Sequence, residues 1–289
     1  MNTSHLFYIA VVVVIVCICL SVVLLSSVLG YHCVRLGVTH NKAAVQVPRG
    51  PIQGNIPKII HMTYYAKSKI HPKVYENIKR FAPDYELRVY DDNDCEEFMK
   101  ENFPPAVLAQ FHKLKGAHKA DLARYCYLYK HGGVYLDIKT ELITPLSTLI
   151  KHDSSTFYSV LDTTVTQTIY QGIIACPPRH PLIAESLNFV VATPWWIPRL
   201  LYIVFVVDMY IRIAKRCKRK RLRPGTYLGQ SETNEVYVLL PLHVAFRNPP
   251  KSSPYHCPDG LDRYGACGYV LSSESKDPII KLRYADFPW

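Results

Sequence analysis

The chain has 289 residues, of which 49% are hydrophobic and 20% charged, so it is long enough for one large folded domain and too apolar to be disordered. Its 34 Lys and Arg residues outnumber its 23 Asp and Glu residues, which gives a net charge of +11. Much of this excess is local, because seven of the nine residues in Lys215–Arg223 are basic. A short basic run favours an anionic membrane surface as the partner and argues against nucleic acid.

The first predicted element is a membrane-spanning helix. Residues Leu6–Gly30 carry no charged side chain, and at helical rise they are long enough to cross a hydrocarbon core of about 30 Å. We therefore expect residues 1–30 to be a transmembrane signal anchor, with a cleaved signal peptide as the alternative. Arg35, Lys42 and Arg49 follow the run, and by the positive-inside rule they argue against a lumenal domain.

A stem and a folded domain follow the predicted anchor. Residues 31–55 contain Pro and Gly at spacings typical of a linker, and we expect residues 56–289 to form the domain. Strand patterns alternate with helix patterns in its first half, which predicts an α/β fold with a mixed, largely parallel sheet flanked by helices. The predicted strands are Ile59–Met62, Tyr85–Tyr90 and Val134–Leu136, and the predicted helices are Pro72–Phe81, Asp94–Asn102, Ala106–Lys113 and Ala117–Lys130.

A second apolar stretch, Trp195–Ile213, runs into the basic cluster within a predicted insertion at residues 188–224. It contains Asp208 and Arg212, which a spanning helix would have to bury at a cost of roughly 2.5 to 3.5 kcal/mol each. Tryptophans at its start and basic residues at its end predict a hydrophobic helix lying in the membrane interface. The alternative is a core helix followed by a solvated basic loop.

One predicted helix places an acid and a base on the same face. Asp121 and Arg124 are three residues apart, a spacing at which side chains on a helix can pair. A pair of this kind on a face that points into a core is either structural or in contact with a polar ligand.

The Gly132-Gly133 pair follows this helix and leads into a strand that ends at Asp137. Glycine permits the sharp turn, and the strand would place the Asp137 carboxylate at the carboxyl edge of the sheet, where ligands of α/β folds bind. A carboxylate in that position can hold a divalent cation that neutralises a diphosphate leaving group. Asp137 as an ordinary strand-end cap is the alternative.

Three motifs in this order resemble the sugar transferases of glycosyltransferase family 32, which include yeast Golgi mannosyltransferases, inositolphosphoceramide mannosyltransferases and alpha-1,4-galactosyltransferase relatives. They are the IPKIIH sequence of Ile56–His61, the ADLARY sequence of Ala120–Tyr125 and the GGVYLD sequence of Gly132–Asp137. The resemblance covers residues 56–146 and, more loosely, residues 171–187.

The resemblance implies a GT-A (Rossmann-like) fold and assigns roles to its motif residues. Asp121 would bind hydroxyls of the donor ribose or sugar, and Arg124 would orient the sugar or the diphosphate. Asp137 would be the first Asp of the DXD metal motif, but Lys139 stands where the second acid is expected. Either Mn²⁺ or Mg²⁺ is held by Asp137 and the donor phosphates, or Lys139 pairs with the diphosphate directly.

Two further residues are candidate nucleotide contacts. His61 ends the first motif and would line the nucleotide pocket, with a satisfied core histidine as the alternative. Asp92 follows the second predicted strand and would touch the nucleotide, with a helix N-cap as the alternative.

The function implied is that of a membrane-bound glycosyltransferase that moves a hexose from UDP- or GDP-hexose to a glycan or lipid acceptor with retention of configuration. We expect a single-pass protein of the Golgi or ER membrane with a lumenal catalytic domain, and no nucleic-acid partner. Lys139 motivates an alternative, a catalytically inactive pseudoenzyme that binds sugar nucleotides or glycans at the membrane. A lipid-gathering membrane scaffold is a third possibility.

The nine cysteines include no CxxC pair, which argues against a structural zinc site. Cys257 and Cys267 bracket a loop rich in Gly, Pro and Asp, and they would form a disulfide if this region lies in an oxidising compartment.

Overall fold

The computed structural model of the chain describes residues 47–48, 51–153, 156–162, 167–230, 235–245, 250–253 and 267–282. The predicted anchor at residues 1–30, most of the predicted stem and the predicted partner Cys257 lie outside these residues. In the part of the chain that is described, no helix combines the length and apolar character that crossing a membrane requires.

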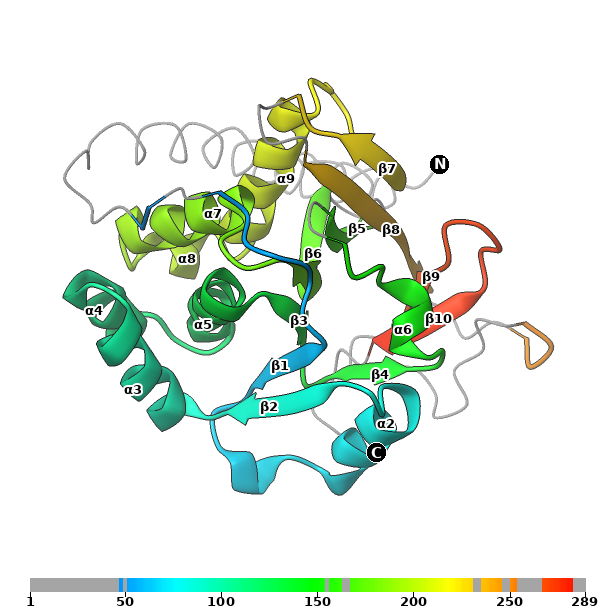
Figure 1. Cartoon of the computed structure of the whole chain (residues 1–289), viewed down its shortest axis with the longest axis horizontal. Helices are drawn as coiled ribbons and strands as arrows, with labels where there is room; N and C mark the ends of the chain where they lie inside the picture. The colour runs from blue at the N-terminus through cyan, green and yellow to red at the C-terminus, as the bar shows by residue number, and fades with distance from the viewer. Residues whose placement is uncertain are drawn as a thin grey trace, which may run out of the picture.

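The described residues form one ten-stranded sheet with helices on both faces (Figure 1). The strands run in the order β2-β1-β3-β6-β5-β8-β9-β10-β4, and β7 pairs with β8. Their bounds are β1 Ile59–Thr63, β2 Glu86–Tyr90, β3 Gly133–Leu136, β4 Thr140–Leu142, β5 Thr156–Asp162, β6 Thr168–Cys176, β7 Gly225–Leu228, β8 Val236–Ala245, β9 Cys267–Leu271 and β10 Pro278–Leu282.

The sheet is mixed, as predicted, but it is not largely parallel. Of the nine strand pairs that the described residues form, only β1–β2, β1–β3 and β5–β8 are parallel, and the other six are antiparallel. The prediction failed because the alternation of strands and helices holds only as far as β3. After β3, the chain adds β6 antiparallel to it, a pairing that needs no crossover helix.

Helices cover both faces of the sheet and enclose two hydrophobic cores (Figure 1). One core lies under α3, α4, α5, α7, α8 and α9, and the other under α2 and α6. Their bounds are α2 Pro72–Phe81, α3 Asp92–Asn102, α4 Pro105–Lys113, α5 Ala117–His131, α6 Leu146–Leu149, α7 Pro181–Ala192, α8 Ile197–Leu200 and α9 Val204–Arg216; a 3-10 turn, η1, spans Lys67–Lys69.

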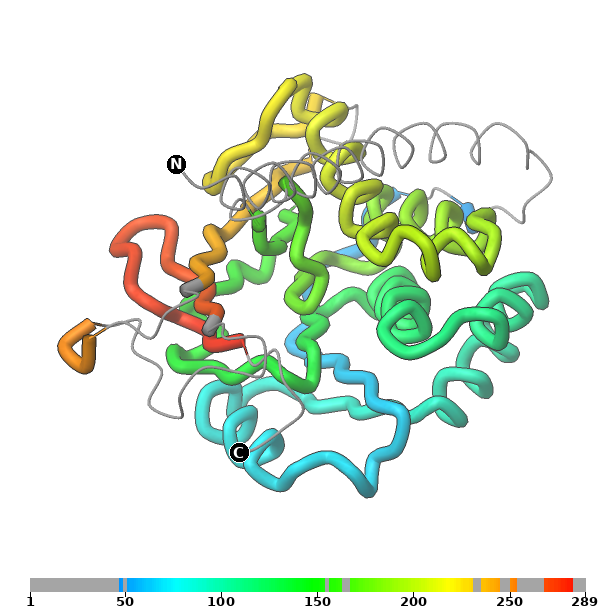
Figure 2. Tube along the Cα trace, turned by 180° about the vertical axis from the view of Figure 1, so that it is seen from behind, coloured from blue at the N-terminus to red at the C-terminus, as the bar shows by residue number. Residues whose placement is uncertain are grey.

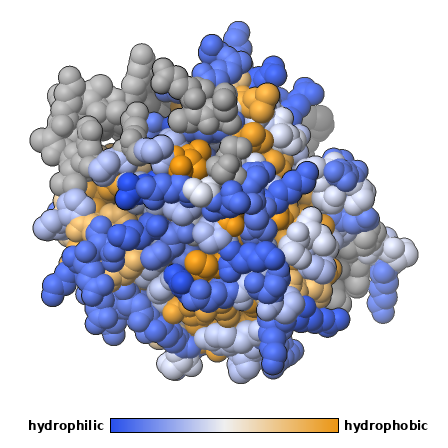
Figure 3. Space-filling model, in the orientation of Figure 1, coloured by the Kyte–Doolittle hydropathy of each residue, from blue (hydrophilic) through white to orange (hydrophobic). Residues whose placement is uncertain are grey.

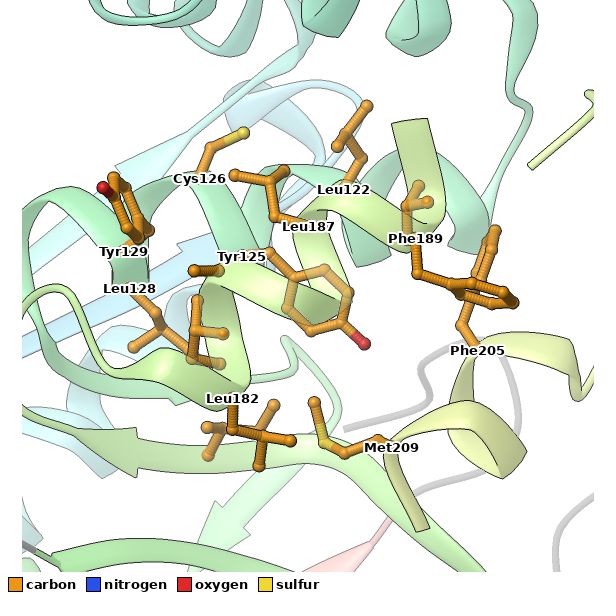
Figure 4. Close-up of a cluster of buried hydrophobic side chains, with 14 of the residues drawn as sticks. Leu122, Tyr125, Cys126, Leu128, Tyr129, Leu182, Leu187, Phe189, Phe205 and Met209 are labelled. Atoms are coloured by element: carbon orange, nitrogen blue, oxygen red, sulfur yellow. The ribbon is translucent and has the colours of Figure 1, made fainter. Parts of the chain in front are cut away.

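The helix α5 lies at the centre of the larger core, and the residues from His118 to Tyr129 are mostly buried. Figure 4 shows Tyr125 of α5 reaching between α7 and α9, toward Phe205 and Met209. Its hydroxyl donates to Oε1 of Gln171 at 2.6 Å, so this polar group is satisfied inside the core. Because α5 is buried on most of its surface, its position is fixed, and so are the positions of the polar residues that it carries.

The apolar stretch Trp195–Ile213 is not one interfacial helix. It forms the short α8, a turn at Leu201–Ile203, and α9, whose apolar side packs into the larger core through residues that include Phe205, Met209 and Ile213. The charges that would have opposed membrane insertion are paired inside the protein, since Arg212 Nε donates to Asp208 Oδ2 at 2.6 Å. The core-helix alternative therefore describes residues 204–216.

The C-terminal hairpin closes on the strand that follows Asp137. Strand β10 pairs antiparallel with β9 on one side and with β4 on the other, with Ile280 opposite Leu142 and Leu282 opposite Thr140. The hairpin and β4 lie together in both views of the chain (Figures 1 and 2). The segment that carries the predicted metal motif is thus held by residues near the other end of the chain.

Candidate active site

The helix α5 positions Asp121 and Arg124, both of which are buried. Nη1 of Arg124 lies 3.2 Å from Oδ1 of Asp121, which is the contact that the i, i+3 spacing predicted. One turn of a core helix therefore carries a buried charged pair. A buried pair of this kind is costly unless further partners satisfy it.

Asp137 follows β3 in a tight turn. Its backbone N–H donates to Gly172 O of β6 at 2.8 Å, and its carbonyl accepts from Thr140 N at 2.8 Å. These two bonds tie the turn to β6 and to the start of β4. The Asp137 side chain keeps 32% exposure, so its carboxylate is open to a ligand while its backbone is fixed.

The structure brings the two motifs together through Arg124. Nη2 of Arg124 donates to Oδ1 of Asp137 at 3.3 Å, while Nη1 faces Asp121 on the other side. The guanidinium also lies over the ring of Tyr135, 4.6 Å from its centroid. One cation therefore bridges a helix carboxylate and a strand-end carboxylate, and the three residues line one place in the fold.

The surroundings of Arg124 keep its charge in place. Burial alone disfavours the charged form, but the neighbouring Tyr135, Asp137 and Asp121 outweigh it and raise the pKa of Arg124 above its ordinary value. Its Nε is buried and has no hydrogen-bond partner among the described residues. A buried donor without a partner is costly, so this atom is one that a bound anion would satisfy.

His118 extends this polar row to the segment after α7. Its Nδ1 lies 3.1 Å from Oδ2 of Asp121, and its Nε2 lies 3.2 Å from Pro198 O in α8. The ring also contacts Tyr202 and Phe205, with centroids 5.0 and 5.4 Å apart. The row of contacts therefore runs from Asp137 through Arg124, Asp121 and His118 to α8.

His118 and Tyr135 were not among the predicted site residues, although their spacing carried a signal. His118 precedes Asp121 by three residues on α5, and so shares its face. Tyr135 precedes Asp137 by two residues on β3, and so shares its side of the sheet. The hydroxyl of Tyr135 bonds Oγ1 of Thr63 at 2.9 Å, which links this row to the end of β1.

His61 lies in the core and not on a pocket surface. Its side chain is fully buried, and its ring nitrogens contact Gly132 O at 2.9 Å and the Tyr90 hydroxyl at 3.1 Å. Burial lowers its pKa to about 3. Both nitrogens have partners within the chain, which agrees with the core-histidine alternative, and a nucleotide contact by His61 stays a prediction.

Asp92 is the first residue of α3 and forms an ion pair with Lys119 of α5 at 2.6 Å. The N-cap of this helix is Asp91, whose carboxylate accepts from Asp94 N at 3.1 Å in a capping box. Asp92 is therefore not the cap. It follows β2, as the sequence indicated, and a nucleotide contact by Asp92 stays a prediction.

Few side chains at this site could serve as ligands for a divalent cation. No group of three His, Cys, Asp or Glu side chains suited to a metal occurs among the residues that the structure describes. The Asp137–Lys139 turn offers one carboxylate, which already contacts Arg124, and one ammonium. A cation bound mainly by substrate phosphates and water needs only one or two protein carboxylates, so Asp137 suffices as the single protein ligand.

Comparison with known proteins agrees with this arrangement. Residues 68–156 match the model of the family described as "Glycosyltransferase sugar-binding region containing DXD motif". The chain is related to DXD-type glycosyltransferases. This match spans α2 to the start of β5, and it includes Asp121, Arg124 and Asp137. Enzymes with this motif generally use a divalent cation.

Individual relatives are sugar transferases of yeasts and a virus. A mannosyl phosphorylinositol ceramide synthase of Saccharomyces cerevisiae is 26% identical over 231 residues, which is 75% of this chain and 56% of that protein. An inositol phosphoceramide mannosyltransferase of Schizosaccharomyces pombe is 35% identical over 88 residues, 29% of this chain and 24% of that protein. A glycosyltransferase of Acanthamoeba polyphaga mimivirus is 31% identical over 133 residues, 44% of this chain and 52% of that protein.

These matches confirm the resemblance to family 32 sugar transferases. The chain spans about half the length of the budding-yeast and viral relatives. Among solved structures, the match to the PaToxG glycosyltransferase covers 65% of this chain and 78% of that one, with a TM-score of 0.43 and 15% identity.

Proposed function

We propose that this protein transfers a hexose from a UDP- or GDP-linked donor to a glycan or lipid acceptor, with the GT-A fold of such enzymes. The observation that carries the proposal is the bridge that Arg124 makes between Asp121 and Asp137. Two motifs from different elements meet there at the buried guanidinium of Arg124, whose Nε–H has no partner among the described residues. A sugar diphosphate has an anion for that N–H and hydroxyls for the carboxylates.

In this proposal the residues act by positioning and by electrostatics. Arg124 Nε donates to a diphosphate oxygen, while Asp121, held by Arg124 and His118, accepts from donor hydroxyls. Lys139 places a second positive charge at the turn after β3, near the departing diphosphate. Attack by the acceptor on the same face as the leaving group, with retention, needs no protein nucleophile, only reactants held in place.

A divalent cation, with Mn²⁺ the expected ion, would be held by Asp137 and the donor diphosphate. It would supply Lewis-acid stabilisation of the leaving group. Asp137 keeps one oxygen that is not engaged by Arg124, because the bond from Nη2 goes to Oδ1. That oxygen is the atom of this chain from which we expect cation binding.

The relatives' names narrow the donor and the acceptor. Two of them are named for mannosyl transfer to phosphorylinositol ceramide or inositol phosphoceramide. We therefore propose mannose as the first donor sugar to test and an inositol-containing sphingolipid as the first acceptor. A Golgi or ER membrane location, with an N-terminal anchor, is the setting in which such an acceptor is met.

The decisive experiment is a donor screen. Purified full-length protein is incubated with UDP- and GDP-hexoses, with and without Mn²⁺, and donor hydrolysis and transfer are both measured. Asp137→Asn keeps the size of the side chain and removes its charge, so we expect turnover to fall by about 100-fold or more. Asp84→Asn is the matched control, because Asp84 is exposed and forms a surface ion pair with Lys58.

Two results would contradict the proposal. If no nucleotide sugar binds the wild-type protein, the site is not a donor site. If a donor binds but neither hydrolysis nor transfer occurs, and Asp137→Asn binds it equally well, the inactive sugar-nucleotide-binding alternative replaces the enzyme.

A further inference from the structure

A cluster of exposed apolar side chains lies between α7 and α9. Nine large hydrophobic residues are exposed in the described part of the chain, and five of them fall within residues 195–203. We call these five the ledge: Trp195, Trp196, Leu200, Tyr202 and Ile203. Leu200 is 74% exposed and Tyr202 is 67% exposed, so most of the surface of these two residues is accessible to solvent. Figure 3 shows one face of the molecule, on which hydrophilic residues predominate and apolar residues show through between them.

Core packing and hydrogen bonds hold the backbone of the ledge in place. Ile197, within the segment, is buried in the larger core, and Leu201 N donates to Ile197 O at 2.8 Å. Before the segment, Gln110 of α4 donates through Nε2 to Thr193 O at 2.7 Å. After it, Val204 N donates to Leu201 O at 3.0 Å as α9 begins. The exposed side chains therefore extend into solvent from a backbone that is fixed by hydrogen bonds.

The ledge borders the candidate active site. His118 connects the two, because its ring contacts Asp121 on one side and both Pro198 O and the Tyr202 ring on the other. A surface that binds the ledge would thus lie next to the carboxylates that we assign to the donor.

The composition of the ledge and its surroundings fits a lipid headgroup region. Tryptophan, tyrosine and arginine are the residues that gather at membrane interfaces, and here Arg199 lies over the Trp195 ring, 4.4 Å from its centroid. At the far end of α9, about 20 Å away by helical rise, the Lys215–Arg223 run exposes most of its basic side chains. Both lie on one outer rim of the molecule (Figures 1 and 2).

The start of the described chain lies on the same side. Val47 N donates to Oδ1 of Asn188 on α7 at 2.8 Å, and Nδ2 of Asn188 donates back to Val47 O at 3.1 Å. Residues 1–46, which include the predicted anchor, therefore join the domain beside the helix that leads into the ledge. A bilayer that holds the anchor would be within reach of these side chains.

We propose that the ledge docks on an anionic phospholipid bilayer and opens the sugar-transfer site toward it. The aromatic and aliphatic side chains enter the headgroup region, and the basic run contacts lipid phosphates. The docking itself is independent of the proposed transfer reaction; only its effect on turnover rests on that function.

Tryptophan fluorescence tests the docking directly, because the chain has three tryptophans and two of them are in the ledge. Trp289→Phe leaves Trp195 and Trp196 as the only tryptophans, and excitation at about 295 nm selects their emission over that of the tyrosines. Full-length protein with this change is reconstituted into phosphatidylcholine–phosphatidylserine vesicles with brominated acyl chains. We expect quenching relative to vesicles of unbrominated lipid; equal emission in both, as a protein-binding surface would give, would overturn the proposal.

A variant pair tests the consequence for transfer. Leu200→Ser with Ile203→Ser removes two exposed apolar side chains of the ledge and leaves the contact of Tyr202 with His118 in place, so we expect transfer to a bilayer-embedded lipid acceptor to fall about tenfold while donor hydrolysis is unchanged. Leu228→Ser is the matched control, since Leu228 is 72% exposed and lies on β7, outside the ledge. A loss in Leu228→Ser equal to that in the ledge variant contradicts a specific role for the ledge. If no variant hydrolyses donor, the proposed function fails, and the quenching result still decides the docking.

Discussion

Lys139 occupies the position at which the resemblance leads one to expect a second carboxylate. Together with Arg124 it gives the turn after β3 two positive charges beside the single carboxylate of Asp137. A diphosphate in this place would be neutralised mainly by side chains, and a divalent cation would contribute through one protein ligand only. The number of carboxylates at such a site sets how tightly it binds the cation.

Lys139→Asp should therefore strengthen cation binding. The change restores two carboxylates at i and i+2, and we expect the affinity for Mn²⁺ in the presence of UDP or GDP to rise by about tenfold or more. Isothermal titration of Mn²⁺ into the nucleotide-bound protein measures it. Lys139→Ala is the control, because it removes the ammonium without adding a ligand; equal Mn²⁺ affinity in the two variants would refute this account of the turn.

Part of the candidate site could be predicted residue by residue from the sequence. The pairing of Asp121 with Arg124 follows from their spacing on one helix, and the structure adds Asp137 to the same guanidinium. The contact of His118 with Pro198 joins residues 80 positions apart, so no local pattern carried it. The full burial of His61 could not be predicted either, because its position at the end of a motif does not indicate which side of β1 is buried.

The α5–β3 junction is the element-scale feature that joins the two motifs. Gly133 adopts φ 95°, and a Cβ added there would lie 2.6 Å from Ile59 O in the neighbouring β1. That backbone oxygen is fixed by the parallel pairing of β1, so it cannot move aside without disturbing β1 and β3 together. Glycine is required here by conformation and by space.

Gly133→Ala should destabilise the fold by more than its backbone strain alone. We expect a loss of unfolding free energy above the roughly 1–3 kcal/mol that a strained backbone costs, measured by guanidinium denaturation. Gly54→Ala separates the two contributions, because Gly54 has φ 66° and open space around its Cβ position. Equal losses in both variants would mean that the Ile59 contact is unimportant.

Helices and strands with a clear hydrophobic periodicity could be predicted from the sequence, whereas the pairing of the strands after Asp137 could not. The helix Pro72–Phe81 was predicted with its observed bounds, and the strands and helices up to Asp137 differ from the observed ones by two residues or fewer. The break between α8 and α9 was missed because the apolar run is continuous in composition. The division depends on the core, which buries Ile197 before the break and Val204 after it and leaves most of the residues between them exposed.

Two buried histidines couple the stability of the whole molecule to pH. His61 and His180 are fully buried, and burial lowers the pKa of each from 6.5 to about 3. On acidification the unfolded chain takes up these protons first, near pH 6.5, while the folded chain resists until about pH 3. The contribution of these two histidines to the unfolding free energy is therefore fully present above pH 6.5, and it is lost progressively as the pH falls from 6.5 toward 3.

The expected slope is about 1.4 kcal/mol of unfolding free energy per pH unit for each histidine, in the window between the two pKa values. Denaturant unfolding at about pH 7.5 and about pH 5.5 measures it. His180→Gln should reduce this contribution by half, whereas the exposed His112→Gln should leave the slope unchanged. A slope that is the same in wild type and His180→Gln would rule out this origin for the acid sensitivity.

The stretch matched by the family model ends at residue 156, yet the β4 strand that follows the Asp137 turn has its partner at Pro278–Leu282. A fragment trimmed to the matched stretch would retain Asp121, Arg124 and Asp137 and lose the strand that anchors the turn between them. Truncation products and expression fragments of this gene should therefore be judged by whether they reach β10, since possession of the motifs does not ensure a correctly assembled pocket.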